Sequence, residues 1–228
     1  MTHIAFIMDG NRRFAKKLLL QPHKGHEHGV KTVDMVLEWC VQHEMSEVTL
    51  YAFSLQNLNR PKHEFNYLMD LFKKVFFDPD YLDKLLRADF KTTFIGRLDI
   101  FSKEIQEGCA LLEEKTAHCT QRKLNICFGY GGREELVDAV FSLATRVKEG
   151  TLLPEQIDEG CISSQLGVQS SPDLIIRTGG EFRTSNFLPW QSVYSEWFFL
   201  EKKWPELVQE DLDTVLAQFQ KRERRFGA

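Results

Sequence analysis

Six short apolar segments recur along the chain, and most of them end in polar or glycine-rich turns. Five fit this pattern well: Ile4–Met8, Val48–Phe53, Thr92–Ile95, Leu124–Phe128 and Leu174–Arg177. The sixth, Val193–Leu200, fits it less closely. Runs that are apolar on both faces are typical of strands in a parallel sheet that helices cover. The pattern therefore predicts a six-stranded, mainly parallel sheet.

Segments with helical periodicity lie between these strands. They are Val30–His43, Phe65–Phe76, Glu104–Ala117, Glu134–Lys148 and Asp211–Arg222. The alternation of strand and helix predicts an α/β fold. No repeat or linker divides the sequence, so we expect residues 1–228 to form a single domain. In such sheets ligands bind at the carboxyl ends of the strands, which is where candidate chemistry is sought.

The first strand ends in a group of residues suited to an anion. Asp9 follows the strand directly, and Gly10, Asn11, Arg12 and Arg13 come next. Backbone amides at a helix start bind phosphates, and glycine allows a close approach of the backbone. Asp9 could hold a divalent cation, most simply Mg²⁺, against such a phosphate. The alternative is a strand end and a tight turn followed by a solvated basic helix.

Two more strand ends carry similar chemistry. Ser54, Asn57 and Arg60 follow the second strand, although these are also ordinary loop residues. The segment from Arg177 to Asn186 follows the fifth strand and combines arginines, glycines and hydroxyl groups. Because the guanidinium fork matches phosphate oxygens, we favour an anion site here over a salt-bridged hairpin.

Other motifs are ambiguous or are set aside. Glu196 lies in an apolar, aromatic stretch and needs either an arginine or a metal as its partner. His23, His26 and His28 lack zinc-ligand spacing and a cysteine partner, so we discount zinc. The run of residues 129–132 is not a dinucleotide fingerprint, because neither its glycine spacing nor a following acidic residue fits.

Composition narrows the class of protein. The 228 residues include 29 Lys or Arg and 33 Asp or Glu, giving a net charge of −4, so a general nucleic-acid binder is excluded. A hydrophobic fraction of 43% excludes a disordered chain. We expect a cytoplasmic protein with reduced thiols, because the 5 cysteines are scattered and the sequence shows no signal-peptide pattern. The sequence also contains no apolar run long enough to span a bilayer.

Taken together, the motifs are far more specific than any one of them. In chain order they are His3–Lys17, Gly25-His26, Tyr51–Ser54 with Asn57 and Arg60-Pro61, Arg177–Glu181 with Arg183, Ser185–Leu188, Trp190-Gln191, Tyr194–Glu196 and Arg222–Gly227. This set resembles the cis-prenyltransferase family, the undecaprenyl and dehydrodolichyl diphosphate synthases. The resemblance covers essentially the whole chain.

The resemblance implies a Mg²⁺-dependent condensation. An allylic diphosphate, farnesyl diphosphate in the simplest case, is the primer, and isopentenyl diphosphate is added repeatedly with cis double bonds. The expected product is a long-chain polyprenyl diphosphate, the precursor of a glycosyl carrier lipid, which partitions to a membrane. The resemblance also implies a homodimer, either free in the cytoplasm or peripheral on the cytosolic face of a membrane.

Site roles follow from the same resemblance. Asp9, Asn57 and His26 are the expected catalytic residues, although which group accepts the proton stays open. Asp9 and Glu196 are the expected metal ligands, with Glu196 acting either in its own chain or across a dimer interface. The expected substrate-binding residues are Gly10, Asn11, Arg12, Arg13, Ser54, Arg60, Arg177, Arg183, Ser185, Arg225 and Gly227. The Phe65–Phe76 stripe is either one wall of a hydrophobic tunnel or plain core.

The chain also departs from the family pattern. Pro22 stands where an arginine is usual, so either Lys24 substitutes for it or the allylic diphosphate is held more weakly. Leu58 stands where an aromatic residue is usual, and Arg12 where bacterial members often have glycine. A rival reading is a non-catalytic partner subunit, but such subunits lose the metal aspartate. A phosphatase would need a nucleophile beside a base, which no motif supplies.

Overall fold

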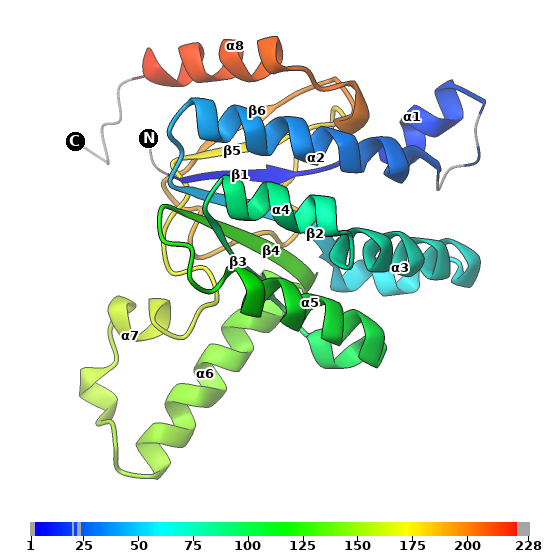
Figure 1. Ribbon diagram of the computed structural model, residues 1–228. Coiled ribbons are helices and arrows are strands. Elements are labelled where there is room, and N and C mark those ends of the chain that lie inside the picture. The colour runs from blue at the N-terminus through cyan, green and yellow to red at the C-terminus, as the bar shows by residue number, and fades with distance from the viewer. Residues whose placement is uncertain (1–2, 20, 22–23, 223–228) are drawn as a thin grey trace.

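Six strands form one sheet in the order β3-β4-β2-β1-β5-β6, and every pairing in it is parallel. The computed structural model describes residues 3–19, 21 and 24–222 (Figure 1). The strands are β1 His3–Ile7, β2 Glu47–Ser54, β3 Phe90–Ile95, β4 Arg122–Tyr130, β5 Leu174–Arg177 and β6 Glu196–Phe199. The predicted α/β fold with a six-stranded sheet is therefore confirmed, and the sixth strand is shorter than the apolar run that predicted it.

Helices connect the strands. The α-helices are α1 Asn11–Lys17, α2 Lys24–Gln42, α3 Lys62–Phe76, α4 Pro79–Arg87, α5 Lys103–Thr116, α6 Gly132–Lys148, α7 Glu159–Ser163 and α8 Gln209–Gln220. Four 3₁₀ turns join them within the described residues: η1 Leu55–Asn59, η2 Leu98–Ile100, η3 Pro154–Gln156 and η4 Trp204–Glu206. Helix α2 begins at Lys24, before the predicted start at Val30. The sequence pattern missed these first turns because they carry glycine and histidine instead of an apolar stripe.

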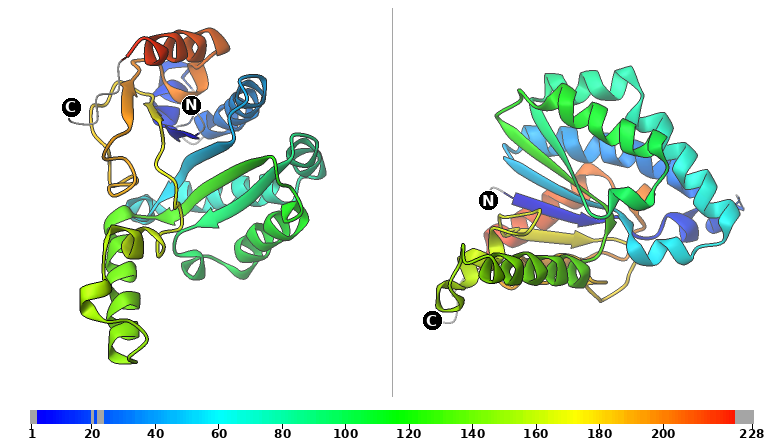
Figure 2. Two further views of the ribbon diagram at one scale, coloured as in Figure 1. Left: turned by 90° about the vertical axis from the view of Figure 1, so that its left-hand side faces the viewer. Right: turned by 90° about the horizontal axis from the view of Figure 1, so that it is seen from below.

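Alternate residues of each strand enter two separate cores. On β1, Ile4 and Phe6 join a large cluster with α2, α3, α4, α5 and α8, whereas Ala5 and Ile7 join a smaller one on the other face. Figure 2 shows the same division, with α6 on the opposite side of the sheet from α2, α4 and α5. Burial on both faces explains why the strands read as continuous apolar runs.

The strand register brings the candidate residues to one edge of the sheet. Ile7, at the end of β1, pairs with Tyr51 of β2 and with Arg177 of β5. Asp9 follows β1 and Ser54 is the last residue of β2, so the three carboxyl-end motifs converge as the sequence predicted.

Candidate active site

Asp9 is held in place by the turn that follows β1. Gly10 has φ 103°, a left-handed conformation that favours glycine, and its backbone N–H donates to Asp9 Oδ1 at 2.6 Å. A Cβ atom at Gly10 would lie 2.6 Å from Lys203 Cβ, so a side chain does not fit there. The carbonyl oxygen of Asp9 accepts from Thr178 Oγ1 at 2.8 Å and from the N–H of Trp204 at 2.9 Å.

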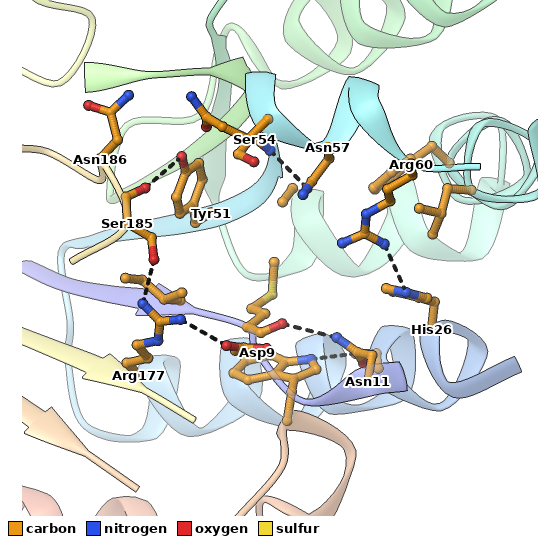
Figure 3. A pocket seen from close by; sticks show the side chains of 18 of the residues that line it. Asp9, Asn11, His26, Tyr51, Ser54, Asn57, Arg60, Arg177, Ser185 and Asn186 are labelled. Carbon is orange, nitrogen blue, oxygen red and sulfur yellow. Dashed lines mark hydrogen bonds and ion pairs between the residues drawn. The ribbon is translucent and has the colours of Figure 1, made fainter. Parts of the chain in front are cut away.

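Arg177 lies beside Asp9 on the neighbouring strand and organises the loop after β5. Its side chain is only 3% exposed, and its Nη2 donates to Asp9 Oδ2 at 2.8 Å. Its Nη1 donates to Ser185 Oγ at 2.7 Å and to the Arg183 carbonyl at 2.5 Å (Figure 3). One guanidinium therefore joins the first and fifth strand ends.

The loop after β5 also contains the salt bridges that the alternative reading expected. Glu181 accepts from Arg13 Nη1 at 3.1 Å and from Arg183 Nη1 at 2.6 Å. Arg13 Nη2 also lies 3.2 Å from Asp9 Oδ1. Arg13 and Arg183 are exposed, so their guanidinium groups remain accessible to an anion from solvent.

The charge of Asp9 is stabilised by these neighbours. Burial raises the pKa of Asp9, but the hydrogen bond and charge of Arg177, the charge of Arg13 and the Gly10 N–H together outweigh it. The net result is a pKa below the usual range of an aspartate. Asp9 is therefore an anion at neutral pH, as a metal ligand must be.

The opposite wall comes from the ends of β2, α2 and η1. Asn57 Oδ1 accepts from the Ser54 N–H at 3.1 Å, which fixes the turn between β2 and η1. Arg60 Nη1 lies 3.4 Å from His26 Nε2 and 2.9 Å from Glu64 Oε1. Figure 3 shows Asn57, Arg60 and His26 across the opening from Asp9.

Two hollows meet at this place. The larger has a volume of about 840 Å³, and the smaller a volume of about 470 Å³. Both are lined by Met8, Asp9, Asn11, His26 and Arg60. The smaller hollow, which we call the cationic basin, is also lined by Gly10, Arg12, Arg13, Lys16, Glu181 and Arg183. The larger continues between α2 and α3 along the apolar side chains of Val30, Val33, Leu68, Leu71 and Phe72.

Most, but not all, of the predicted site residues meet here. Arg177, Ser185, Ser54 and Asn57 line the larger hollow. Glu196 is the first residue of β6, so it lies at the amino end of a strand, whereas Asp9 follows a carboxyl end. Arg222 binds its carboxylate, so within one chain Glu196 does not join Asp9. Arg225 and Gly227 lie outside the described residues.

Lys24 contacts two neighbouring side chains and not the two hollows. Its Nζ binds Glu27 Oε1 at 2.9 Å and lies 5.6 Å from the centre of the Tyr67 ring, and it lines neither hollow. Lys16, one turn after Arg12 on α1, lines the cationic basin instead.

Several contributors were missed by the sequence reasoning. Thr178 and Trp204 hold the backbone of Asp9, and the Trp204 indole also donates to the Gly29 carbonyl of α2 at 2.9 Å. Tyr51 donates to the Ser185 carbonyl at 3.3 Å and lines the larger hollow. Tyr51 and Thr178 both lie inside motifs that carried the resemblance, and this membership was a signal that could have found them. Trp204 lies outside these motifs and gave no such signal.

A divalent cation fits this site only together with a phosphate. Among the described residues no three His, Cys, Asp or Glu side chains cluster as a metal site. Asp9 is paired with Arg13 and Arg177, and the second carboxylate of the cationic basin, Glu181, is already paired with Arg13 and Arg183. Mg²⁺ is usually bound by one or two carboxylates plus substrate phosphates and water, so Asp9 suits Mg²⁺ that arrives with a diphosphate.

A cationic basin that opens into an apolar cavity is suited to a phosphate ester with a hydrocarbon tail. Comparison with known proteins agrees: residues 7–227 match the family described as "Putative undecaprenyl diphosphate synthase". The chain belongs to this family and is a prenyltransferase of the cis type.

Individual relatives extend the match over the whole chain. The tritrans,polycis-undecaprenyl-diphosphate synthase (geranylgeranyl-diphosphate specific) of Methanopyrus kandleri is 44% identical over 99% of this chain and 84% of its own length. The isoprenyl transferase of Thermus thermophilus is 41% identical over 99% of this chain and 88% of its own. The crystal structure of lavandulyl diphosphate synthase from Lavandula x intermedia, in complex with dimethylallyl diphosphate, superposes with a TM-score of 0.95. It is 31% identical and covers 100% of this chain and 98% of that one.

Proposed function

We propose that this chain elongates an allylic diphosphate by repeated condensation with isopentenyl diphosphate and releases a long-chain cis-polyprenyl diphosphate. The observation that carries the proposal is the meeting of the cationic basin and the apolar cavity at Asp9. The allylic diphosphate needs cations for its leaving group and an apolar space for its tail, and both are present at one strand end. Charge that develops on the leaving diphosphate is stabilised by preorganised cations.

The two diphosphates divide the cationic side chains between them. Arg12, Arg13 and Arg60, together with the Gly10–Asn11 backbone, are assigned to the allylic diphosphate. Arg177, Arg183 and Ser185 are assigned to isopentenyl diphosphate, because the loop after β5 presents them together. His26 lines both the basin and the cavity, and Asn57 lines the cavity, so we assign both to the neighbourhood of the reacting carbons.

Mg²⁺, held by Asp9 and diphosphate oxygens, would supply charge neutralisation for the two anions. To bind the metal ion, the Asp9 carboxylate would give up part of its contact with Arg13 and Arg177. Because these arginines stay beside it, they remain available to the diphosphate. Glu196 can contribute only from a second subunit.

The apolar half of the cavity is proposed as the entrance to the tunnel for the growing chain. Leu68 and Phe72 of the Phe65–Phe76 stripe line it, and Leu68 also belongs to the large core together with Met69 and Phe76. The stripe thus serves both functions that the sequence left open. Val30 and Val33 of α2 form the facing wall.

The primer is farnesyl diphosphate or its homologue with one more isoprene unit. Farnesyl diphosphate is the expectation from the resemblance. The names of several relatives specify geranylgeranyl diphosphate, among them the Methanopyrus kandleri enzyme, which supports the longer primer. Both primers carry the same diphosphate, so the difference lies in the apolar part of the cavity.

We further propose that the enzyme acts as a homodimer through α6. Val137, Val140 and Phe141 are 66%, 60% and 74% exposed, and their spacing places them on one face of the helix. Figure 1 shows α6 extending from the body of the molecule, so this face is open to a second copy. A symmetric pair would bury these side chains against their counterparts.

The product would partition to a membrane and supply a glycosyl carrier lipid of the undecaprenyl or dehydrodolichyl type. No helix within residues 3–19, 21 and 24–222 is long and apolar enough to cross a bilayer. Following the family resemblance, we propose that the enzyme acts in the cytoplasm, either free or peripheral on the cytosolic face of a membrane.

Incubation of the purified protein with Mg²⁺, labelled isopentenyl diphosphate and each primer in turn tests the proposal. We expect a ladder of polyprenyl diphosphates in thin-layer or mass analysis, with a lower KM for the true primer. No elongation with either primer would instead support the reading as a non-catalytic partner subunit.

A further inference from the structure

Glu64 is a buried carboxylate beside the cationic basin to which neither the motifs nor the comparisons assign a role. It lies in the first turn of α3 and is 3% exposed. It lines neither hollow, so it is placed behind the walls and not in contact with their contents. A buried carboxylate is costly unless it is paired, so its partners explain its presence.

Its partners are two arginines from different parts of the chain. Glu64 Oε1 lies 2.9 Å from Arg60 Nη1 and 3.6 Å from Arg12 Nε. Arg60 ends η1, whereas Arg12 belongs to α1, so the carboxylate connects α1 with the start of α3. Arg12 and Arg60 both line the cationic basin.

The carboxylate also resolves an electrostatic conflict. Burial lowers the pKa of Arg60, Glu64 raises it, and Arg12 lowers it further because two like charges lie close together. A negative charge that contacts both guanidinium groups offsets this repulsion. A guanidinium has five N–H donors, so Arg60 can bind Glu64 and still present donors to an anion.

We propose that Glu64 is a positioning residue that holds Arg12 and Arg60 together as one diphosphate-binding pair. This inference rests on the proposed function, since it assumes that the basin receives the allylic diphosphate. Glu64 acts only through the two arginines. Figure 3 shows Arg60 directed toward the opening, next to His26, which is the orientation that Glu64 fixes.

Calorimetric titration with inorganic diphosphate, in the presence of a metal chelator, separates this role from general support of the fold. We expect Glu64→Gln, which keeps the shape and removes the charge, to bind diphosphate roughly tenfold more weakly than wild type. Glu64→Asp keeps the charge on a shorter side chain, so its affinity for diphosphate should lie between those of wild type and Glu64→Gln. Glu104→Gln is the matched control, because that residue pairs with Lys73 at 2.6 Å and lies in neither hollow.

A second measurement tests whether Glu64 acts through Arg12. In an Arg12→Ala background, the loss caused by Glu64→Gln should be smaller than in wild type, because one of its two targets is gone. In steady-state kinetics, KM for the primer should rise by a larger factor than kcat falls.

Three results would overturn the inference. The first is a folded Glu64→Gln protein that binds diphosphate as tightly as wild type, and the second is strict additivity with Arg12→Ala. The third result applies if Glu64→Gln does not fold: it is a Glu64→Asp protein that binds diphosphate with wild-type affinity. Failure of the wild-type protein itself to bind diphosphate would contradict the proposed function and would remove the basis of this inference with it.

Discussion

Arg177 Nη2 lies 2.8 Å from Asp9 Oδ2. Arg177 is the last residue of β5, and Asp9 comes shortly after the end of the neighbouring strand β1. The arginine is almost fully buried, whereas the side chain of Asp9 is 30% exposed. The carboxylate thus balances a buried charge and at the same time faces the opening. Any change at Asp9 must therefore affect both the chemistry and the stability.

Asp9→Asn should lower kcat by at least about a thousandfold, equivalent to roughly 4 kcal/mol, because the metal-binding charge is lost. Arg177 then keeps its neutral partners but loses its anion. We expect the free energy of unfolding to fall by about 1.5–3 kcal/mol, the range for a hydrogen bond to a charged group. Turnover assays and urea denaturation measure the two effects.

Asp138→Asn is the matched control for that experiment. Asp138 pairs with Arg97 at 2.6 Å, but its side chain is 58% exposed. Asp138→Asn should therefore lower the free energy of unfolding by less than about 1 kcal/mol and leave turnover unchanged. If Asp9→Asn keeps near-normal turnover, Asp9 is a structural residue only.

Val33→Phe should shorten the products. Val33 lines the apolar part of the cavity, and a phenyl ring there would fill space assigned to the growing chain. Mass analysis of the product ladder should show its maximum shifted by at least one isoprene unit. Val208→Phe, at a position that is 43% exposed and lines neither hollow, adds the same ring outside the cavity and away from the proposed dimer face, and it serves as the control. An unchanged ladder in Val33→Phe would place the growing chain elsewhere.

Phe141→Asp should convert the proposed dimer into monomers. A carboxylate at the centre of an apolar interface loses its hydration without gaining a partner. We expect the dissociation constant of the dimer to rise by at least about a hundredfold, a value typical of the loss of a central aromatic anchor. Light scattering after size-exclusion chromatography reports the mass, with Ile100→Asp, 42% exposed on η2, as the control. A Phe141→Asp protein that elutes as a dimer at every concentration argues against α6 as the interface.

His3 predicts how stability depends on pH. Its ring is buried between Thr49 and Ser170, with Nε2 2.7 Å from Thr49 Oγ1 and Nδ1 3.0 Å from Ser170 Oγ. Burial lowers the pKa of His3, and the charges of Glu47 and Asp173 only partly oppose this. The folded state therefore favours the neutral ring, so stability should be full above the unfolded pKa of about 6.5 and decline as pH falls below it.

Urea midpoints measured between pH 7.5 and 5 check this expectation. His3→Gln should show a shallower decline than wild type over that range, because no buried ring has to accept a proton. His118→Gln, at an exposed position, should follow the wild-type curve. Parallel curves for His3→Gln and wild type would show that other groups cause the decline.

Much of the fold was predictable because burial on both faces of the sheet leaves a strong pattern. Each confirmed strand overlaps an apolar run, and the parallel order then forces Asp9, Ser54 and Arg177 to one edge. Short helices such as α4 were missed, because nine residues provide too little periodicity. The α2 start was missed for a different reason, since its first turns face the site instead of the core.

The contacts that complete the site were less accessible to sequence reasoning. Trp204 donates its backbone N–H and Thr178 its hydroxyl group to the Asp9 carbonyl, and both contacts depend on loop geometry that the sequence does not reveal. The motif around Glu196 was recognised, but its position at the amino end of β6 follows only from the strand register. Glu64 could be noticed only from its burial between two arginines.

The position of β1 inside the sheet has a consequence for biosynthesis. β1 is translated well before β5, yet β5 is one of its two neighbours in the sheet, and Leu174 of β5 pairs with Ile4. Until β5 leaves the ribosome, the nascent chain carries an open and largely apolar strand edge, which is a template for aggregation. The residues that surround Asp9 from Arg177 to Trp204 are also made after β1, so binding competence can arise only once this segment has been synthesised. We expect the nascent chain to depend on chaperones during that interval.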